Sequence, residues 1–200
     1  MIDLFKYSKR NKFFNFIVQN IFKLDKKNLL KPFFSKENID LEFNNEFFYN
    51  YIKNNKITKW SGQNPGEHYQ SNHDLQKLNN LKKPIKLLEQ YLNTEIKSKI
   101  FKNPKIGRFK VKSLWFTIQK INQGHPKHNH PKSLLSGVYY HQIDENNGGE
   151  LEIFFNDKKI EYSPKKKDLI IFNSETFHSV KAYYGKNDRI AIAWDAIYTF

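Results

Sequence analysis

The feature that most constrains this fold is a succession of short alternating segments in the second half of the chain. From about residue 105, apolar and polar residues alternate with the period of two that is typical of strands. Turn-forming residues separate the segments, at 146–149, at Pro164 and at 185–188. Seven or so strands at this spacing predict a sandwich or barrel. The segments are FKVKSLWFTIQKI, SLLSGVYYHQI, GELEIFF, KIEYS, DLIIFN, HSVKAYY and RIAIAWDAIY.

Helical spacing marks the residues before that point. Leucine and isoleucine recur at intervals of three and four after Asn72 or Asp74, and Pro84 is expected to break or restart the helix that they predict. Asn44 or Asn45 is placed to cap a shorter helix. Turn formers at 58–75 predict a long loop between the two helices. The pattern as a whole predicts a mainly β (α+β) fold with helices at its front.

We expect a single domain at residues 31–200, with a helical front at 31–104 and a β core at 105–200. Residues 1–30 read as a basic amphipathic N-terminal extension. A helix packed on the domain is preferred for it, ahead of a helix that binds a membrane surface or a partner. No segment predicts a transmembrane span or a secretory signal, so we expect a cytoplasmic protein.

The net charge of +14 raises the question of an anionic partner. Nearly all of this charge comes from lysine, because the only arginines are Arg10, Arg108 and Arg189. Specific readout of bases and phosphates favours arginine, so a nucleic acid is not the expected partner. We expect a small-molecule or peptide substrate and allow for a homodimer. The chain has no cysteine, so a metal site would have to use histidine, aspartate or glutamate.

Histidines gather just before the second predicted strand. His128 and His130 form an H-x-H pair, and residues two apart in a strand point to the same face. His178 follows the strand DLIIFN and a loop, which in a double-stranded β-helix would bring it across from the pair. Arg189 opens a later apolar strand, where it predicts either a bidentate carboxylate clamp or an ordinary ion pair with a nearby aspartate. Three imidazoles on Fe(II) leave positions for a chelating 2-oxo acid and for O2.

These motifs in this order resemble the 2-oxoglutarate (2OG) and Fe(II)-dependent oxygenases, and more narrowly a 2OG-Fe(II) oxygenase family of marine bacteria and phages. Trp115 precedes HNHPKSLLSGVYY, and GGELEIFF, PKKKDLIIFNSETFHSV and RIAIAWD follow, with HYQSNHDL upstream. The resemblance covers residues from about 32 to 200. It implies a double-stranded β-helix of the jelly-roll or cupin-like kind. It also implies a dioxygenase that hydroxylates its substrate and releases succinate and CO2.

The resemblance assigns a role to six residues. Three histidines would bind Fe(II) and form the catalytic centre: His128, His130 and His178. Arg189 would hold the C5 carboxylate of the co-substrate 2-oxoglutarate. Tyr139 or Tyr140 would offer it a hydroxyl; adjacent strand residues face opposite ways, so only one of them can, and we favour Tyr140.

The chain departs from the family's pattern at several positions. The wider superfamily has an aspartate at the second ligand position, where this chain has His130, so the site is more positive. Ala191 stands two residues after the arginine, where these enzymes often have a serine that helps bind the co-substrate. Lys167 replaces the expected glycine before Asp168, and Asp195 replaces a final asparagine.

The main alternative is a cupin-like metal-binding β-barrel with non-2OG chemistry or a ligand-binding role. Such proteins usually add a glutamate shortly after the H-x-H pair, which residues 131–135 lack, and they have no need of Arg189. A non-enzymatic module that binds an anionic partner is the third candidate. We expect His125 to lie in a loop and Trp115 and Phe172 to be core residues. Substrate specificity is expected at residues 55–75.

Overall fold

The computed structural model describes residues 33–54, 58–60, 68–101, 107–131 and 133–199. The predicted extension at residues 1–30 lies outside these ranges, and so does most of the middle of the predicted loop. None of the described helices is long and apolar enough to cross a membrane.

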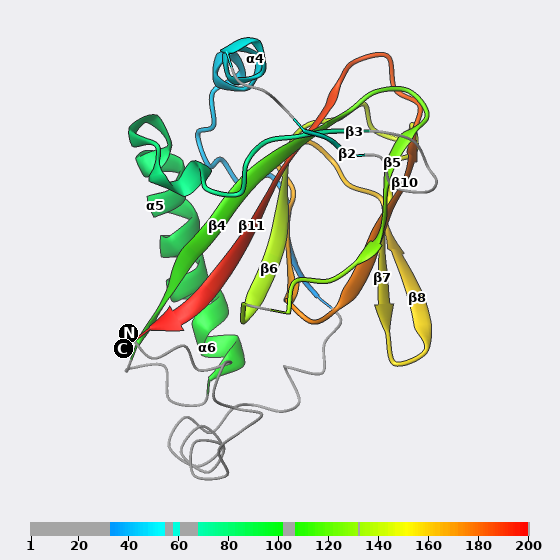
Figure 1. The fold of residues 1–200 in the computed structure, drawn as a ribbon. Helices are drawn as coiled ribbons and strands as arrows, with labels where there is room; N and C mark the ends of the chain where they lie inside the picture. The colour runs from blue at the N-terminus through cyan, green and yellow to red at the C-terminus, as the bar shows by residue number, and fades with distance from the viewer. Residues whose placement is uncertain (1–32, 55–57, 61–67, 102–106, 132, 200) are drawn as a thin grey trace.

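Two antiparallel sheets face each other and form the body of the molecule (Figure 1). Within the described residues, the larger sheet has seven strands in the order β1-β9-β6-β11-β4-β3-β2, and the smaller has four in the order β5-β10-β7-β8. The larger sheet is built from β1 (Phe34–Lys36), β2 (Thr58–Trp60), β3 (His68–Gln70), β4 (Arg108–Gln119), β6 (Leu135–Gln142), β9 (Leu169–Asn173) and β11 (Arg189–Thr199). The smaller is built from β5 (Gln123–His128), β7 (Leu151–Phe155), β8 (Lys158–Tyr162) and β10 (Phe177–Tyr183).

The two predicted helices are present. α4 (Asn45–Asn54) begins after Asn44, whose side-chain oxygen accepts a hydrogen bond from the backbone N–H of Glu46 at 2.8 Å. Pro84 lies in the first turn of α5 (Lys82–Tyr91), where its missing N–H would have no partner, so it restarts the helix. The neighbouring short helices are η1 (Leu75–Lys77), η2 (Asn79–Leu81), the π-helical η3 (Leu92–Ile96) and α6 (Lys97–Ile100).

Strict alternation along the larger sheet separates an apolar core from a pocket that contains the polar residues. On β11, Ile190 and Ile192 pack in the core that includes the residues of α5 and η3, whereas Arg189 and Ala191 line the space between the two sheets. β4 repeats this arrangement one strand away. The helices α5 and α6 lie along the outer face of the larger sheet (Figure 1). Polar residues on the inner face are therefore directed at the smaller sheet and not at solvent.

The mainly β architecture with antiparallel sheets confirms the predicted fold class. All seven predicted strands are present. The structure adds β5, which the sequence analysis did not predict, and three short strands, β1 to β3, in the region expected to be helices and loop. The predicted loop at 58–75 was therefore wrong in two places, at 58–60 and 68–70, where β2 and β3 extend the larger sheet.

Candidate metal centre

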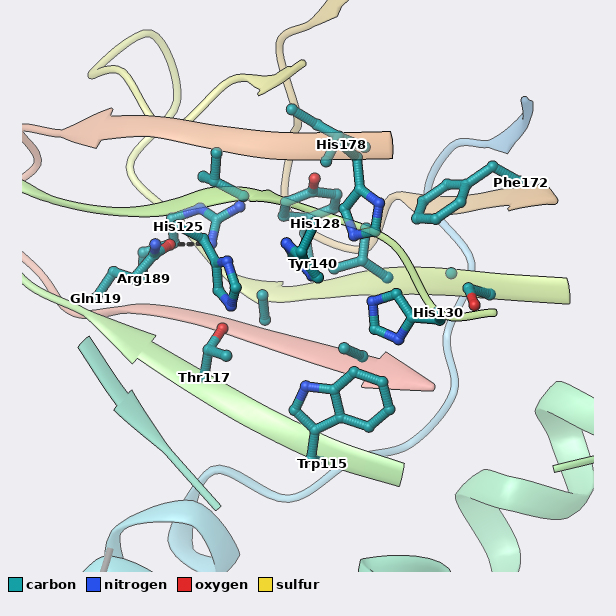
Figure 2. A pocket seen from close by; sticks show the side chains of 17 residues that line it. Trp115, Thr117, Gln119, His125, His128, His130, Tyr140, Phe172, His178 and Arg189 are labelled. Atoms are coloured by element: carbon teal, nitrogen blue, oxygen red, sulfur yellow. Dashed lines mark hydrogen bonds between the residues drawn. The ribbon is translucent and has the colours of Figure 1, made fainter. Parts of the chain in front are cut away.

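Three histidines meet at one end of the space between the sheets (Figure 2). His128 ends β5 and is paired directly with His178 near the start of β10, and their ring centroids are 4.2 Å apart. His130 lies two residues beyond His128, outside the strand, and its backbone N–H donates to the carbonyl of Ser174 at 2.7 Å. One nitrogen from each ring lies within 4.8 Å of the others. The structure thus brings together the three histidines that the sequence analysis proposed as ligands.

Each of these rings has an acceptor at its Nδ1 atom. The Nδ1 of His128 lies 2.8 Å from the carbonyl oxygen of Pro126, and that of His178 lies 3.0 Å from the carbonyl oxygen of Thr176. The Nδ1 of His130 lies 3.3 Å from Oδ1 of Asp195. A proton on each Nδ1 leaves the Nε2 lone pair of each ring for a metal, which is the usual arrangement for ligating histidines.

Burial favours the neutral form of two of these imidazoles, those of His128 and His178. Desolvation lowers the pKa of His178 to about 3 and that of His128 to about 4. A neutral imidazole is the form that binds a metal. The two ligand candidates therefore offer their lone pairs at neutral pH without competition from protons.

Arg189 lies at the opposite end of the pocket and is 1% exposed. One of its Nη atoms donates to the side-chain oxygen of Gln119, and the other is 3.4 Å from the carbonyl oxygen of Gly149. Its Nε has no hydrogen-bond partner, and no carboxylate of the described residues lies within 4.0 Å of the guanidinium. The ion pair with a nearby aspartate that the sequence analysis considered is therefore not formed, and a buried cation without a counter-ion is costly.

Gly149 allows the arginine to take this position. Its φ of +74° belongs to the left-handed region, and a Cβ there would lie 3.1 Å from both Cδ and Nε of Arg189. The glycine-rich turn before β7 therefore does more than reverse the chain. It places a backbone carbonyl against the guanidinium and leaves room for the side chain.

The two candidate tyrosines face opposite sides of the larger sheet. Tyr140 lines the pocket, with its ring 5.0 Å from the guanidinium carbon of Arg189. Burial raises the pKa of Tyr140 to about 12, so its hydroxyl keeps the proton that it could donate. Tyr139 packs instead against Phe43 in the core under the helices, with ring centroids 5.7 Å apart. The structure places Tyr140, and not Tyr139, where it could contact a bound co-substrate.

Polar residues that the sequence analysis did not single out complete the pocket, whose cavity is about 50 Å³. Thr117 and Gln119 lie on the inner face of β4, with Gln119 beside Arg189, and Figure 2 shows the Thr117 hydroxyl directed inwards. His125 was expected in a loop, but it lies in β5, lines the pocket and packs against His128 at 4.2 Å between ring centroids. The sequence did contain a signal for Thr117 and Gln119. They are alternate residues of β4, and every second residue of this strand faces inwards.

Two aromatic residues expected in the core have a second role. Trp115 and Phe172 are each 3% exposed, as expected of core residues, but both line the pocket. Trp115 stacks on His130 at 5.3 Å and on His73 at 4.3 Å between ring centroids. Phe172 lies 4.6 Å from the ring of His178. These rings form the apolar wall around the three histidines and restrict how they can turn.

The pocket thus has three histidines at one end and a buried arginine at the other. A family with the description "Putative 2OG-Fe(II) oxygenase" matches residues 113–163. The chain is similar to the 2OG-Fe(II) oxygenases. The matched segment includes His128 and His130 but ends before His178 and Arg189, and the structure brings these two into the same pocket. The resemblance seen in the sequence is confirmed, whereas its marine bacterial and phage subgroup stays a prediction.

Solved structures with this fold include several 2OG-Fe(II) oxygenase relatives. A prolyl hydroxylase from Trichoplax adhaerens, in complex with a hypoxia inducible factor oxygen degradation domain peptide fragment, has a TM-score of 0.61 at 15% identity, covering 96% of this chain and 95% of that chain. The viral collagen prolyl hydroxylase vCPH from Paramecium Bursaria Chlorella virus-1, in a 2OG complex, has a TM-score of 0.57 at 18% identity, covering 84% and 97%. HygX from Streptomyces hygroscopicus, with nickel and 2-oxoglutarate bound, has a TM-score of 0.58 at 10% identity, covering 88% of both chains.

At these identities the likeness concerns the fold, which confirms the predicted jelly-roll core. No curated protein matches the chain. The ligand of this pocket therefore follows from its own residues and not from the comparisons.

Proposed function

We propose that the protein is a 2-oxoglutarate- and Fe(II)-dependent dioxygenase that hydroxylates a small-molecule or peptide substrate and releases succinate and CO2. One observation carries this proposal. Arg189 is a buried cation with no carboxylate of the described residues within 4.0 Å, and it shares a pocket with three mutually close histidines. A ligand that satisfies both ends needs a carboxylate for the arginine and further oxygens for a metal, and 2-oxoglutarate has both.

The residues present fit a divalent iron site. Imidazole nitrogen suits iron, and three protein ligands leave coordination positions for other molecules. His128 and His178 are held by backbone carbonyls and His130 by a carboxylate, so all three rings are oriented from outside the site. Iron with a bound 2-oxo acid would supply the oxidising chemistry that activates O2 for attack on a C–H bond.

The chain's own residues would bind and orient the co-substrate. The planar guanidinium of Arg189 matches a carboxylate bidentately, and the acceptor Gln119 fixes one edge of it. The Tyr140 hydroxyl and the Thr117 hydroxyl lie along the path from the arginine to the histidines as further donors. The apolar wall formed by Trp115 and Phe172 would exclude water from the reacting atoms.

The cupin-like alternative uses the same histidines but gives Arg189 no task. It therefore leaves unexplained a destabilising feature of the pocket, a buried guanidinium that has no counter-ion in the described part of the chain. A module that merely binds an anionic partner through its basic surface explains neither the arginine nor the histidines. The homodimer and the absence of a nucleic-acid partner stay predictions, as does the placing of substrate specificity at residues 55–75.

Anaerobic absorption spectroscopy tests the proposal. Metal-free protein is titrated with Fe(II) and then with 2-oxoglutarate, and a new visible charge-transfer band is expected, because it requires a 2-oxo acid chelated to bound iron. The band should be lost in His178→Ala. Iron binding without a band would favour the cupin-like alternative, and absence of metal binding would refute a metal enzyme of either kind.

The arginine clamp has a sharper test with a matched pair of ligands. 2-Oxobutyrate has the chelating 2-oxo acid group but no second carboxylate, so it should bind the iron-loaded wild type more weakly than 2-oxoglutarate. Arg189→Leu should remove most of this preference, about 10- to 100-fold for hydrogen bonds to a charged group. Arg108→Leu removes an exposed arginine at the start of β4 and should leave it unchanged. An Arg189 variant that keeps the full preference would contradict the clamp.

A further inference from the structure

The side chain of Asp195 lies directly behind one of the three histidines. Its Oδ1 atom is 3.3 Å from Nδ1 of His130, and the two side chains are 13% and 14% exposed. The same Oδ1 accepts a hydrogen bond from the hydroxyl of Ser136 on β6 at 2.5 Å. Asp195 thus connects β11, β6 and the ligand loop at one point. This position is occupied by an asparagine in the family pattern.

We propose that Asp195 is a positioning residue of the metal site, which acts through His130 by orienting its ring and by supplying a negative charge to it. The proposal deepens the function proposed above and rests on its metal site. It concerns how tightly and in what electronic state a divalent cation is held, not which molecules react there.

His130 differs from the other two histidines in what orients its ring. His128 and His178 belong to paired strands and direct their Nδ1 atoms at backbone carbonyls, which the strands hold in place. His130 lies beyond the end of β5, so no strand pairing fixes its side chain. Its ring is oriented by the carboxylate behind it and by Trp115, which stacks on it. Among the three histidines, His130 therefore depends most on side chains.

Asp195 also affects the charge around the proposed metal site. Where the wider superfamily supplies a carboxylate ligand, this chain has His130, which carries no negative charge, and Arg189 adds a buried positive charge to the same pocket. A hydrogen bond from a ligating imidazole to a carboxylate makes that imidazole a stronger donor. Asp195 returns a negative charge to the centre through His130, one side chain further from the metal than in the family pattern. The two departures, at positions 130 and 195, would then compensate each other.

The backbone and a neighbouring side chain hold the Asp195 carboxylate in place. The pairing of β11 with β4 shifts register immediately after Asp195, so the strand is irregular at this residue. Such irregularities redirect side chains and are common beside functional sites. Ser136 is paired directly with Asp195 across β6 and β11, and its hydroxyl donates to the carboxylate. The carboxylate is thus held from behind while its Oδ1 faces His130.

Asp195 is not itself in the group of ligand atoms that lie within 4.8 Å of one another, which consists of the three histidines among the described residues. A direct metal ligand would have to join that group. The structure therefore favours action through His130 over direct coordination.

The test measures binding of Co(II) to metal-free protein by isothermal titration calorimetry, together with the visible ligand-field absorption of the bound Co(II). Asp195→Asn replaces the carboxylate with the family's own residue and keeps the shape. We expect about 10- to 100-fold weaker Co(II) binding, the usual cost of losing such an outer partner. At saturating Co(II) the ligand-field bands should shift, because the donor strength of His130 has changed. Ser136→Ala should produce a smaller weakening.

Three controls separate this role from others. Asp157→Asn removes one negative charge from the exposed turn between β7 and β8 and should leave Co(II) affinity and spectrum unchanged. Asp195→Glu keeps the charge and should recover part of the affinity. Thermal unfolding of the metal-free proteins shows whether a variant is merely damaged. Unchanged Co(II) affinity and spectrum in a folded Asp195→Asn would refute the proposal.

Other outcomes are also decisive. Complete loss of Co(II) binding in a folded Asp195→Asn would assign the carboxylate to the metal itself and overturn a positioning role. If the wild type binds Co(II) and Asp195→Asn weakens it, but no charge-transfer band forms with Fe(II) and 2-oxoglutarate, the proposed function fails and the positioning role stands. If the wild type binds no metal, both fail.

Discussion

Thr117 and Ala191 are paired directly across β4 and β11, and both line the pocket between the sheets. Ala191 occupies the position at which the related enzymes often have a serine that helps bind the co-substrate. Thr117 is 7% exposed, and its hydroxyl is directed into the pocket (Figure 2). The hydroxyl that is missing from one strand is thus present on the neighbouring strand, at the same level of the sheet.

This pairing predicts that Thr117 takes over the missing hydrogen bond. Thr117→Val removes the hydroxyl with little change in shape and should weaken 2-oxoglutarate binding to the iron-loaded protein about 10-fold or more, the cost of a hydrogen bond to a charged group. The affinity is measured anaerobically by titrating the charge-transfer band. Fe(II) affinity, measured separately, should not change.

A double variant provides the control. Thr117→Val combined with Ala191→Ser moves the hydroxyl back across the strand pair and should restore most of the affinity. Ala191→Ser alone should not weaken binding. If Thr117→Val binds 2-oxoglutarate as tightly as the wild type, the hydroxyl has no part in the site, and the departure at Ala191 is uncompensated.

Much of the site could be predicted because its strongest features are local patterns. Alternating residues identified seven strands that the structure contains, and an H-x-H pair with a later histidine and arginine identified both ends of the pocket. β5 was missed because Gly124 and Pro126 argue against a strand. The structure explains their presence: β5 is an edge strand of the smaller sheet, where a proline removes no essential hydrogen bond.

The polar residues of the pocket were harder to predict. Alternation places Thr117, Gln119 and Asp195 on the polar face of their strands, and a polar face usually means solvent. Only the second sheet, which covers that face, turns these residues into parts of a site. The i, i+2 argument predicted that His128 and His130 lie close together, as they do, but its reason was incomplete because His130 lies outside the strand.

Gly149 gives a prediction about how the arginine is placed. Gly149→Ala puts a Cβ within 3.1 Å of Arg189 at a residue with a φ of +74°, so the side chain must shift. We expect a loss of stability of about 1–2 kcal/mol from the left-handed backbone and weaker 2-oxoglutarate binding. Gly107→Ala, at a φ of +72° but far from the pocket, should cost stability and leave the affinity of folded protein unchanged. Urea unfolding and the charge-transfer titration measure the two effects, and an unchanged affinity in Gly149→Ala would contradict the prediction.

Lys167 occupies the position at which the family pattern has a glycine, and its φ is +68°. It is the third residue of a turn closed by a hydrogen bond from the N–H of Asp168 to the carbonyl of Lys165, a position where a positive φ favours glycine. Lys167 also forms an ion pair with Asp40 at 2.7 Å, which is exposed and worth little.

Comparing glycine with alanine isolates the backbone effect, since both substitutions remove the ion pair. Lys167→Gly should be more stable than Lys167→Ala by about 1 kcal/mol, because only alanine is strained in the left-handed region. At the exposed neighbour Lys166, which has no positive φ, the order should reverse. Urea unfolding of the four variants gives the comparison. The same order at both positions would show that the turn is not strained at Lys167.

Buried histidines predict that the metal-free protein loses stability in mild acid. The ordinary pKa of histidine is 6.5, but burial lowers the pKa of His125 to about 2 in the folded protein. Below pH 6.5 the unfolded chain binds a proton that the folded chain does not, so the free energy of unfolding falls as the pH falls. The contribution is fully present above 6.5 and is lost progressively towards the folded pKa. Its slope is about 1.4 kcal/mol per pH unit for one fully titrating histidine.

His125→Phe keeps an aromatic ring between its neighbours His68 and His128 and removes this titration. Urea unfolding at a series of pH values should therefore show a shallower decline than the wild type at every pH below 6.5 that can be reached. His141 provides a second test of the direction of this pH dependence, at a residue outside the pocket. Burial lowers the pKa of His141 only to about 4. His141→Phe should flatten the decline only between pH 6.5 and about 4, and below that its slope should rejoin that of the wild type. Equal slopes for all three proteins would mean that burial does not lower the pKa of His125 or His141 in the folded state, and would contradict the prediction.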